Sequence, residues 1–455
     1  MSYSNTVLPI GRCIVVLATL MSQASFAQTA CDSLADQSAV MRASLDQNKS
    51  ISVPANQTWR VDGLELLDDE SIDGQGTICK ATSSPYALKV SGKNVQISNL
   101  TFRPQTVSGQ PNCDIQLADG ASQVRIQSNH FEGNSYSAIC GANESALGGV
   151  AHQQPATGVI LSQNTFVGYV RPIFLHSVNN ITISDNILSD SLHDAIRLRE
   201  NNGQVLISGN QFINVGARTP SADTQDAIDS FWSGQKLIIS DNIVSRTEGV
   251  GFDIKGVDPE NAGIGSRSVI IANNHISETF DSALVLHGDL DNGQANHTIL
   301  ITGNIIEDSV RSGSYADAVI WAKGAVKYLT IADNQLRSNQ ARGITVQTRS
   351  GQSDGSVAGV HITGNMLINN GVSDAPSSIG IFALGVQGIN VSNNTVGNDL
   401  TLANPYTRYG IYLSQIVDGI VKNNILRCNS ASAISVAGNN IIQADNLTTT
   451  TACTL

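Results

Sequence analysis

Eleven short segments of this sequence repeat one pattern, an alternating apolar stretch that ends in an asparagine. Typical segments read VRIQSN, ITISDN and ILITGN. The repeated asparagines lie 22 to 35 residues apart. They are Asn129, Asn164, Asn186, Asn210, Asn242, Asn274, Asn304, Asn334, Asn365, Asn394 and Asn424. A unit of this length indicates a solenoid, in which each repeat buries its apolar face only against its neighbours.

The repeated units are predicted to be strands, because their apolar residues alternate with polar ones. An asparagine at the bend after each strand has a structural explanation. Stacked side-chain amides can hydrogen-bond from one coil to the next, and asparagine tolerates the backbone angles of a turn. We therefore interpret the asparagines as structural rather than functional.

A second short strand follows each asparagine strand, as in AIRLR, AIDSF, FDIKG and ALVLH. With this repeat, the sequence from about residue 50 to 450 resembles the pectin-lyase-like superfamily. The resemblance implies an all-β fold, a single-stranded right-handed parallel β-helix, which we assign to residues 51–455. Before it, DSLADQSAVMRASLDQ has helical apolar spacing, so residues 28–50 are expected to form an N-terminal cap that contains a short helix.

The N-terminus has the pattern of a secretory signal peptide, assigned to residues 1–27. Arg12 precedes an apolar run from Cys13 to Met21, and Ser25 and Ala27 supply the small residues of a cleavage site. The run is shorter than the ~20 apolar residues that span a bilayer, so no membrane anchor is expected. The sequence therefore predicts a secreted or periplasmic protein.

Six cysteines remain after removal of this segment, an even number that favours disulfides in an exported protein. Cys428 and Cys453 are the predicted pair, because they lie near each other in the sequence. The formal net charge is −12, and only 14% of residues are charged. This balance argues against nucleic acid as a partner, since binding it requires a broad basic surface.

Charged side chains gather on the predicted outward face of successive second strands. The inward set is Ile228, Phe252, Ile254, Leu284 and Leu286. Alternation then places these side chains outward: His176, Arg197, Arg199, Asp229, Phe231, Asp253, Lys255 and His287. Continuing the two outward columns gives Ile320 and Ala322, so the alignment confines the charge to the block from His176 to His287. Such a block is ~20 Å long and suits a chain-like ligand, of which an acidic polysaccharide is the expected one.

These residue types match what β-elimination from a uronate polymer requires: a cation for the carboxylate, a base, and an acid for the leaving oxygen. Arg197 and Arg199 are the candidate neutralising cations. Lys255 can be the base if nearby positive charge lowers its pKa, and His287 the acid, or the two can exchange roles. An epimerase would use the same groups.

The remaining outward residues are assigned to substrate binding. They are His176, Asp229, Phe231 and Asp253. Phe231 and Trp232 could form a platform on which a sugar stacks, or could only cover the solenoid. Asp194, Asp226 and Asp317 recur just before the second strand and are interpreted as turn caps.

The site is loosely similar to that of the chondroitinase B and alginate lyase group. The resemblance rests on Lys255 and on the segment from Leu286 to Gly288, in which Leu286 stands where the group has an arginine. It implies no required cofactor beyond a possible Ca²⁺ ion, for which Asp229 and Asp253 are the nearest match to the group's acidic ligands.

Three other interpretations of the charged block stay open. A glycoside hydrolase could use Asp229 and Asp253 as its carboxyl pair. A non-catalytic protein could bind exopolysaccharide or serve as an envelope component. The charges could also be ordinary ion pairs on a solvated face.

Overall fold

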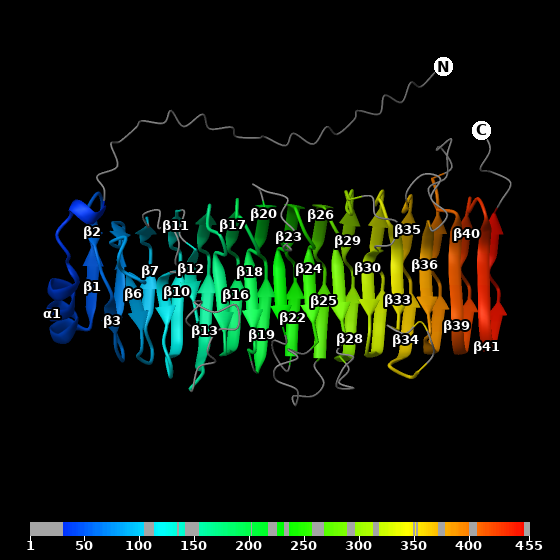
Figure 1. Ribbon diagram of the computed structural model, residues 1–455, viewed down its shortest axis with the longest axis horizontal. Coiled ribbons are helices and arrows are strands. Elements are labelled where there is room, and N and C mark those ends of the chain that lie inside the picture. The colour runs from blue at the N-terminus through cyan, green and yellow to red at the C-terminus, as the bar shows by residue number, and fades with distance from the viewer. Residues whose placement is uncertain are drawn as a thin grey trace, which may run out of the picture.

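The computed structural model shows a long solenoid of parallel strands (Figure 1). The helices of the described residues, a 3-10 helix (Cys31–Ser33) and α1 (Ser38–Asn48), lie at its N-terminal end. It describes residues 31–103, 113–133, 136–141, 154–201, 203–216, 225–231, 236–256, 268–288, 296–312, 318–348, 351, 354–371, 378–399 and 407–449. Within this part of the chain, no helix is both long and apolar enough to cross a membrane. The expected signal peptide, residues 1–27, lies outside the described residues, as do Trp232 and Asp317.

Each full coil contributes three strands, which stack into three columns of parallel pairs. The first column contains β1 (Ser50–Val53), β4 (Ser71–Gly74), β7 (Gln96–Ser98), β10 (Ser122–Gln127), β13 (Ala156–Ser162), β16 (Val178–Ser184), β19 (Gln204–Ser208), β22 (Lys236–Ser240), β25 (Ser268–Ala272), β28 (Asn296–Thr302), β31 (Val326–Ala332), β34 (Val357–Thr363) and β37 (Gln387–Ser392). The second column is a sheet of β2 (Thr58–Arg60), β5 (Thr77–Cys79), β8 (Thr101–Phe102), β11 (His130–Glu132), β14 (Thr165–Val167), β17 (Ile187–Ser189), β20 (Gln211–Val215), β23 (Ile243–Thr247), β26 (His275–Thr279), β29 (Ile305–Glu307), β32 (Gln335–Arg337), β35 (Met366–Ile368), β38 (Thr395–Gly397), β40 (Ile425–Arg427) and β42 (Leu447–Thr449).

The third column follows the second along the chain and carries the outward charged residues. It contains β3 (Leu64–Leu66), β6 (Leu88–Val90), β9 (Cys113–Leu117), β12 (Ser137–Cys140), β15 (Ile173–His176), β18 (Ile196–Arg199), β21 (Ile228–Phe231), β24 (Phe252–Lys255), β27 (Leu284–His287), β30 (Ala318–Lys323), β33 (Arg342–Gln347) and β36 (Ile379–Leu384). The long strands β39 (Tyr409–Lys422) and β41 (Ser432–Ala444) run through both the third and the first columns.

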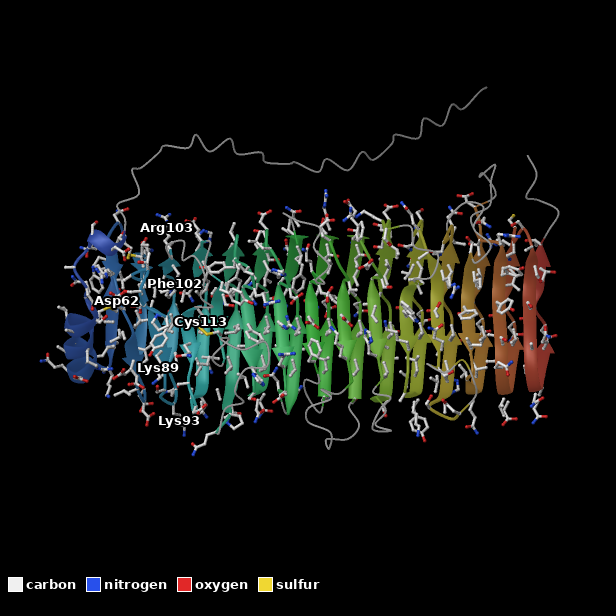
Figure 2. The ribbon with its side chains drawn as sticks, viewed as in Figure 1. Asp62, Lys89, Lys93, Phe102, Arg103 and Cys113 are labelled. Atoms are coloured by element: carbon white, nitrogen blue, oxygen red, sulfur yellow. A yellow bond between two sulfur atoms is a disulfide. The ribbon has the colours of Figure 1, made fainter. Side chains whose placement is uncertain are left out.

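The core is a continuous apolar interior, formed because alternate side chains of every column point inward. Phe102, Phe131 and Phe166 illustrate the stacking: their rings follow one another at 4.7 and 4.8 Å between centroids. Figure 2 shows Phe102 inside the ribbon and Arg103, the next residue, at its edge. Equivalent residues of successive coils therefore pack directly on one another, as expected of a solenoid.

The predicted asparagine ladder is confirmed at all eleven positions. Each side-chain amide donates to the side-chain oxygen of the next asparagine at 2.9 to 3.1 Å, and the ladder extends one step further, to Asn446. The left-handed backbone belongs to the residue before each ladder asparagine, for example Asp185 (φ 56°) and Asp241 (φ 58°). The ladder asparagines therefore contribute hydrogen bonds, and the preceding residue makes the turn.

Two details of the expected strand pattern are corrected. Each repeat holds a further short strand directly after the asparagine, which gives the second column. In β30, Ile320 pairs with Leu284 inside the solenoid, and Trp321 and Lys323 pair with Val285 and His287 outside it. The alignment of Ile320 and Ala322 as outward residues was wrong by one position, and a shift of one residue exchanges the two faces of a strand.

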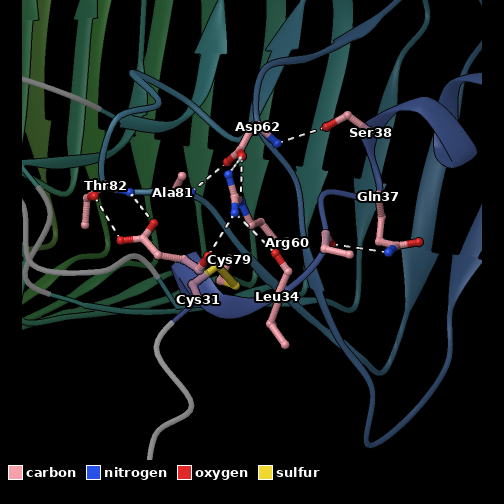
Figure 3. Close-up of a disulfide and its surroundings, with 11 residues drawn as sticks. Cys31, Leu34, Gln37, Ser38, Arg60, Asp62, Cys79, Ala81 and Thr82 are labelled. Atoms are coloured by element: carbon pink, nitrogen blue, oxygen red, sulfur yellow. Dashed lines mark hydrogen bonds and ion pairs between the residues drawn. A yellow bond between two sulfur atoms is a disulfide. The ribbon is translucent and has the colours of Figure 1, made fainter.

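The N-terminal end is closed by the expected cap helix, α1 (Ser38–Asn48), and by a disulfide between Cys31 and Cys79. Close to this disulfide, Arg60 contacts Asp62 at 2.6 Å, and Asp62 accepts a hydrogen bond from the backbone amide of Ala81 (Figure 3). The disulfide thus attaches the chain segment before the solenoid to β5.

A second disulfide joins Cys113 and Cys140. Cys428 is also disulfide-bonded. Its predicted partner, Cys453, lies outside the described residues, so that pairing stays a prediction.

Candidate functional site

The charged residues of β18, β21, β24 and β27 lie on the outward face of the third column, because their neighbours fill the core. Ile228, Phe252 and Leu284 are completely buried. The register pairs Arg197 with Asp229 and Asp229 with Asp253, while Lys255 pairs with His287. The outward set expected from alternation is therefore brought together on adjacent strands.

Lys255 lies at the centre of this cluster. Its Nζ is 2.6 Å from Asp229 Oδ1 and 2.5 Å from Asp253 Oδ2. His287 Nε2 contacts the other oxygen of Asp253 at 3.0 Å. One ammonium group thus links two carboxylates, and the second of these carboxylates also holds the imidazole.

Arg197 connects the cluster to residues that precede the strands. Its Nε is 3.4 Å from Asp229 Oδ2, and its guanidinium is 3.3 Å from Asp194 Oδ2. Arg171 also reaches Asp194, at 3.2 Å. The buried carboxylate of Asp194 is therefore shared by two arginines from successive coils.

Asp194 and Asp226, interpreted from the sequence as turn caps, bind the next coil instead: they accept from the backbone amides of Asp226 (3.3 Å) and Val250 (2.8 Å), respectively. They also belong to the charged cluster, which was not predicted. Carboxylate oxygens of Asp194, Asp226 and Asp229 lie within 4.8 Å of one another, close enough to hold a metal ion. The spacing of Asp226 and Asp229, three residues apart in QDAIDS, was the available signal.

A Ca²⁺ ion between Asp229 and Asp253 does not fit, and that expectation is corrected. The ammonium of Lys255 already lies between these carboxylates. Ca²⁺ takes six to eight oxygen ligands at ~2.3–2.6 Å, and a cation at this position would repel it. In the other candidate metal group, that of Asp194, Asp226 and Asp229, two of the carboxylates already contact the Arg197 guanidinium. A metal ion there would compete with this arginine.

Burial and neighbouring charge move the carboxyl groups in opposite directions. Burial raises the pKa of Asp229 to about 6, against the opposing charge of Lys255. Burial, followed by the charge of Asp194, raises the pKa of Asp226 well above its ordinary value. Burial also opposes ionisation of Asp253, but the hydrogen bond from His287 and the charge of Lys255 outweigh it and lower the pKa of Asp253.

Lys255 does not meet the condition that a general base would require. Burial alone would lower its pKa, but the charges of Asp229 and Asp253 outweigh burial and raise it. The charges closest to this ammonium are negative rather than positive, so the amine stays protonated at neutral pH. The role of Lys255 as base stays a prediction, and the direction of this shift is opposite to the one that the role requires.

The cluster has two layers. The side chains of Asp229 and Asp253 are only 2% and 5% exposed, whereas those of Lys255 and His287 are 20% and 33% exposed. Arg197 is intermediate at 13%. A ligand on this face therefore meets the basic side chains first, and the carboxylates lie beneath them.

Phe231 is surrounded by three of these cations. Arg197, Arg199 and Lys255 lie 5.4, 4.9 and 4.2 Å from the centre of its ring. The aromatic ring is therefore part of the cationic layer, which is compatible with the predicted platform.

His176 lies at the edge of the cluster. It pairs with Arg199 in the register, is 3% exposed, and has Nε2 3.2 Å from Glu200. This imidazole is almost inaccessible to a ligand, and its contact with Glu200 joins it to the neighbouring coil. Its assignment to substrate binding stays a prediction.

Comparison with known proteins identifies the same architecture. Residues 117–287, which end at His287, match the model of the family described as "Right handed beta helix region". A search of curated proteins found no match.

Solved structures with a similar fold include two bacteriophage proteins. A tailspike protein mutant of E. coli bacteriophage HK620, in complex with pentasaccharide, is 11% identical, with a TM-score of 0.56 over 90% of this chain and 77% of the tailspike chain. The pre-mature bacteriophage phi29 gene product 12 is 12% identical, with a TM-score of 0.55 over 91% of this chain and 66% of that chain. At this identity, the similarity establishes the fold alone. The chain is a right-handed parallel β-helix.

Proposed function

We propose that this protein binds and modifies an acidic polysaccharide at the cluster of Arg197, Lys255 and His287, as a lyase or a C5-epimerase. The observation that carries the proposal is the layering of partly exposed cations over buried carboxylates. The carboxylates hold the cations in place, while the cations present positive charge to the ligand. This arrangement suits a uronate carboxylate.

The proposed roles differ from the expectation in one respect. Lys255, Arg197 and Arg199 neutralise the uronate carboxylate, which makes the proton on the adjacent carbon easier to remove. In a lyase, His287 takes that proton and delivers it to the leaving glycosidic oxygen; in a C5-epimerase, His287 takes it and a water molecule returns a proton to the opposite face of the same carbon. We assign this role to His287 because imidazole is the usual proton carrier near neutral pH and because this side chain, 33% exposed, is the most exposed of the three in the cluster. Asp253 orients the ring through its 3.0 Å contact with Nε2.

The overall architecture supports a glycan ligand. The similar HK620 tailspike was solved in complex with pentasaccharide, so this fold can hold an oligosaccharide. The disulfides Cys31–Cys79 and Cys113–Cys140 are typical of an oxidising compartment and support export.

Glycoside hydrolysis is the second candidate, favoured by the opposite pKa shifts of Asp229 and Asp253. Paired carboxyl groups with separated pKa values are the usual acid and base of glycosidases. Both carboxylates lie within 2.6 Å of the same Nζ, so the separation of their contacting oxygens is at most twice that distance. Hydrolysis ranks second because both carboxylates are buried beneath Lys255, where a substrate reaches them less easily than it reaches the cations.

The test is product analysis with alginate, chondroitin, pectin and bacterial exopolysaccharides. Wild-type protein should generate unsaturated ends that absorb in the ultraviolet, or a changed ratio of uronate epimers. His287→Ala should lower the rate at least ~10²-fold. The matched control is His275→Ala, because His275 also contacts a carboxylate, that of Glu307, but lies in the second column, on β26. Its rate should equal that of the wild type.

Other outcomes separate the alternatives. New reducing ends without unsaturation, abolished by Asp253→Asn, would indicate the hydrolase. Equal rates for His287→Ala and wild type would exclude His287 as the proton carrier. Tight binding of an acidic glycan with no change in the glycan would indicate a binding or envelope protein.

A further inference from the structure

The outward face of the third column continues beyond the charged cluster as a row of aromatic rings. Trp321, Phe382 and Tyr412 occupy it, on β30, β36 and β39, and we call them the aromatic row. The register links them directly: Trp321 pairs with Thr345, Thr345 with Phe382, and Phe382 with Tyr412. All three rings are half-buried, whereas the residues on either side of each ring are buried. The row is therefore an outer surface of the solenoid rather than part of its core.

Neighbouring side chains fix the orientation of these rings. Lys323 Nζ lies 4.2 Å from the Trp321 ring, and the Arg342 guanidinium lies 4.7 Å from the Phe382 ring. Phe382 and Tyr412 are stacked, with centroids 5.8 Å apart and planes inclined by 27°. Rings held in this way lose little conformational freedom when a ligand packs on them.

Two polar groups in the row have no hydrogen-bond partner among the described residues. They are the indole Nε1 of Trp321 and the hydroxyl Oγ1 of Thr345, both shielded from solvent. A shielded donor left unpaired is destabilising, so each one requires an explanation. A ligand that combines apolar ring faces with hydroxyl groups would supply both the packing and the acceptors.

The charge of this surface differs from that of the cluster. Within β30, β33, β36 and the third-column part of β39, the charged residues are Lys323 and Arg342, and none is acidic. The row therefore lacks carboxylates for acid–base chemistry and suits binding alone. Lys323 pairs with His287, so the two surfaces are continuous.

We propose that the aromatic row is a second binding region, in which several sugar units of one polysaccharide chain pack against the exposed parts of these rings while the cluster holds another unit. This inference deepens the proposed function and rests on it for the class of ligand. From β24 to β39 there are five strand spacings, or ~24 Å, which extends the site well past His287. The ligand would be a polymer lying along the solenoid axis, and short fragments would be poor ligands.

The test compares chain lengths. Wild type, Trp321→Ala, Phe382→Ala and Tyr412→Ala are titrated calorimetrically with uronate oligosaccharides from alginate and from pectin, from disaccharide to octasaccharide. Tyr328→Ala is the matched control, since Tyr328 is an exposed ring on β31 in the first column. For the wild type, affinity should rise with length. Each ring variant should lose roughly tenfold in affinity for the octasaccharide and nothing for the disaccharide. The control should match the wild type at every length.

The outcomes separate this inference from the proposed function. Ring variants that match the wild type at every length, in a protein that still modifies the polymer, would overturn the aromatic row and leave the proposed function standing. Ring variants that weaken octasaccharide binding, in a protein that modifies no polymer, would support the row and overturn the proposed chemistry. Equal losses for short and long ligands would show that the variants disturb the fold, against the proposal. Absence of binding to every probe would overturn both.

Discussion

At the scale of single residues, ion pairs hold the cluster together. Removing one member of such a pair leaves the other member charged, buried and without its counter-charge. Lys255 is the clearest case, because its ammonium compensates two carboxylates that are almost inaccessible to water. An ion pair that is removed from solvent adds little stability on its own, but breaking it exposes the full cost of the remaining charge. The same residues can therefore hold the site together and bind the ligand.

Lys255→Met should lower the free energy of unfolding by ~3 kcal/mol, because Asp229 and Asp253 lose their shared counter-charge. The double variant Lys255→Met with Asp229→Asn should recover part of this loss, since one of the two stranded charges is gone. Urea unfolding at neutral pH measures both. Additive losses in the double variant would show that the Lys255–Asp229 contact is not energetically coupled.

Outside the site, the buried carboxyl group of Asp114 should make the stability of the fold depend on pH. Asp114 is 2% exposed and accepts a hydrogen bond of 2.6 Å from the hydroxyl of Tyr169. Burial raises its pKa to about 7, against the hydrogen bond and the charge of Lys80. Between about pH 4 and 7 the unfolded chain has released this proton and the folded chain still holds it, so stability falls as pH rises through this window.

Asp114→Asn should remove that fall, since an amide does not ionise and its oxygen can still accept from Tyr169. The difference in Tm between variant and wild type should therefore shift in favour of the variant from about pH 4 to pH 7, and be constant above it. Calorimetric scans across this range measure the difference. A difference that does not change with pH would show that Asp114 keeps an ordinary pKa.

At the scale of elements, the sequence predicted the features that recur in many coils. Its predictions failed at features that are found in a single coil. The eleven asparagines and the inward set of the third column follow from periodicity, which many coils determine together. The position of Trp321 and Lys323 depends on one coil, in which an additional residue precedes the paired positions, and no local pattern marks it. The turn-cap interpretation treated Asp194 and Asp226 as local turn residues, so that role did not indicate that they bind the next coil and meet Asp229 in space.

The ladder should be most sensitive to substitution in its middle. Asn304 donates to Asn334 and to the carbonyl oxygens of Ile271 and Thr302, so Asn304→Ala leaves several shielded groups unpaired. We expect a loss on the order of 3 kcal/mol in the free energy of unfolding. Asn446→Ala is the control, because Asn446 is partly exposed at the last step of the ladder. Chemical unfolding of both should show a clearly smaller loss for the control; equal losses would mean that burial of the amide is irrelevant.

At the scale of the whole molecule, the coils form a one-dimensional array, since each packs mainly on the coil before and after it (Figure 1). A local perturbation should therefore spread over few coils. The charged cluster lies in the middle of the array, whereas the Cys31–Cys79 disulfide lies at the N-terminal end beside α1. Stability at the cap and function at the cluster should be separable.

Replacing Cys31 and Cys79 together by serine should test this separation. A native disulfide stabilises by ~2–4 kcal/mol, mainly by restricting the unfolded chain. Its loss should accelerate amide hydrogen exchange in α1, β2 and β5, and leave β27 to β36 and the activity of the cluster unchanged. Replacing Cys113 and Cys140 is the comparison, and should shift the accelerated exchange to β9 and β12. Faster exchange along the entire solenoid in either variant would show that the coils unfold as one cooperative unit, in which case the array is not governed by contacts between neighbours alone.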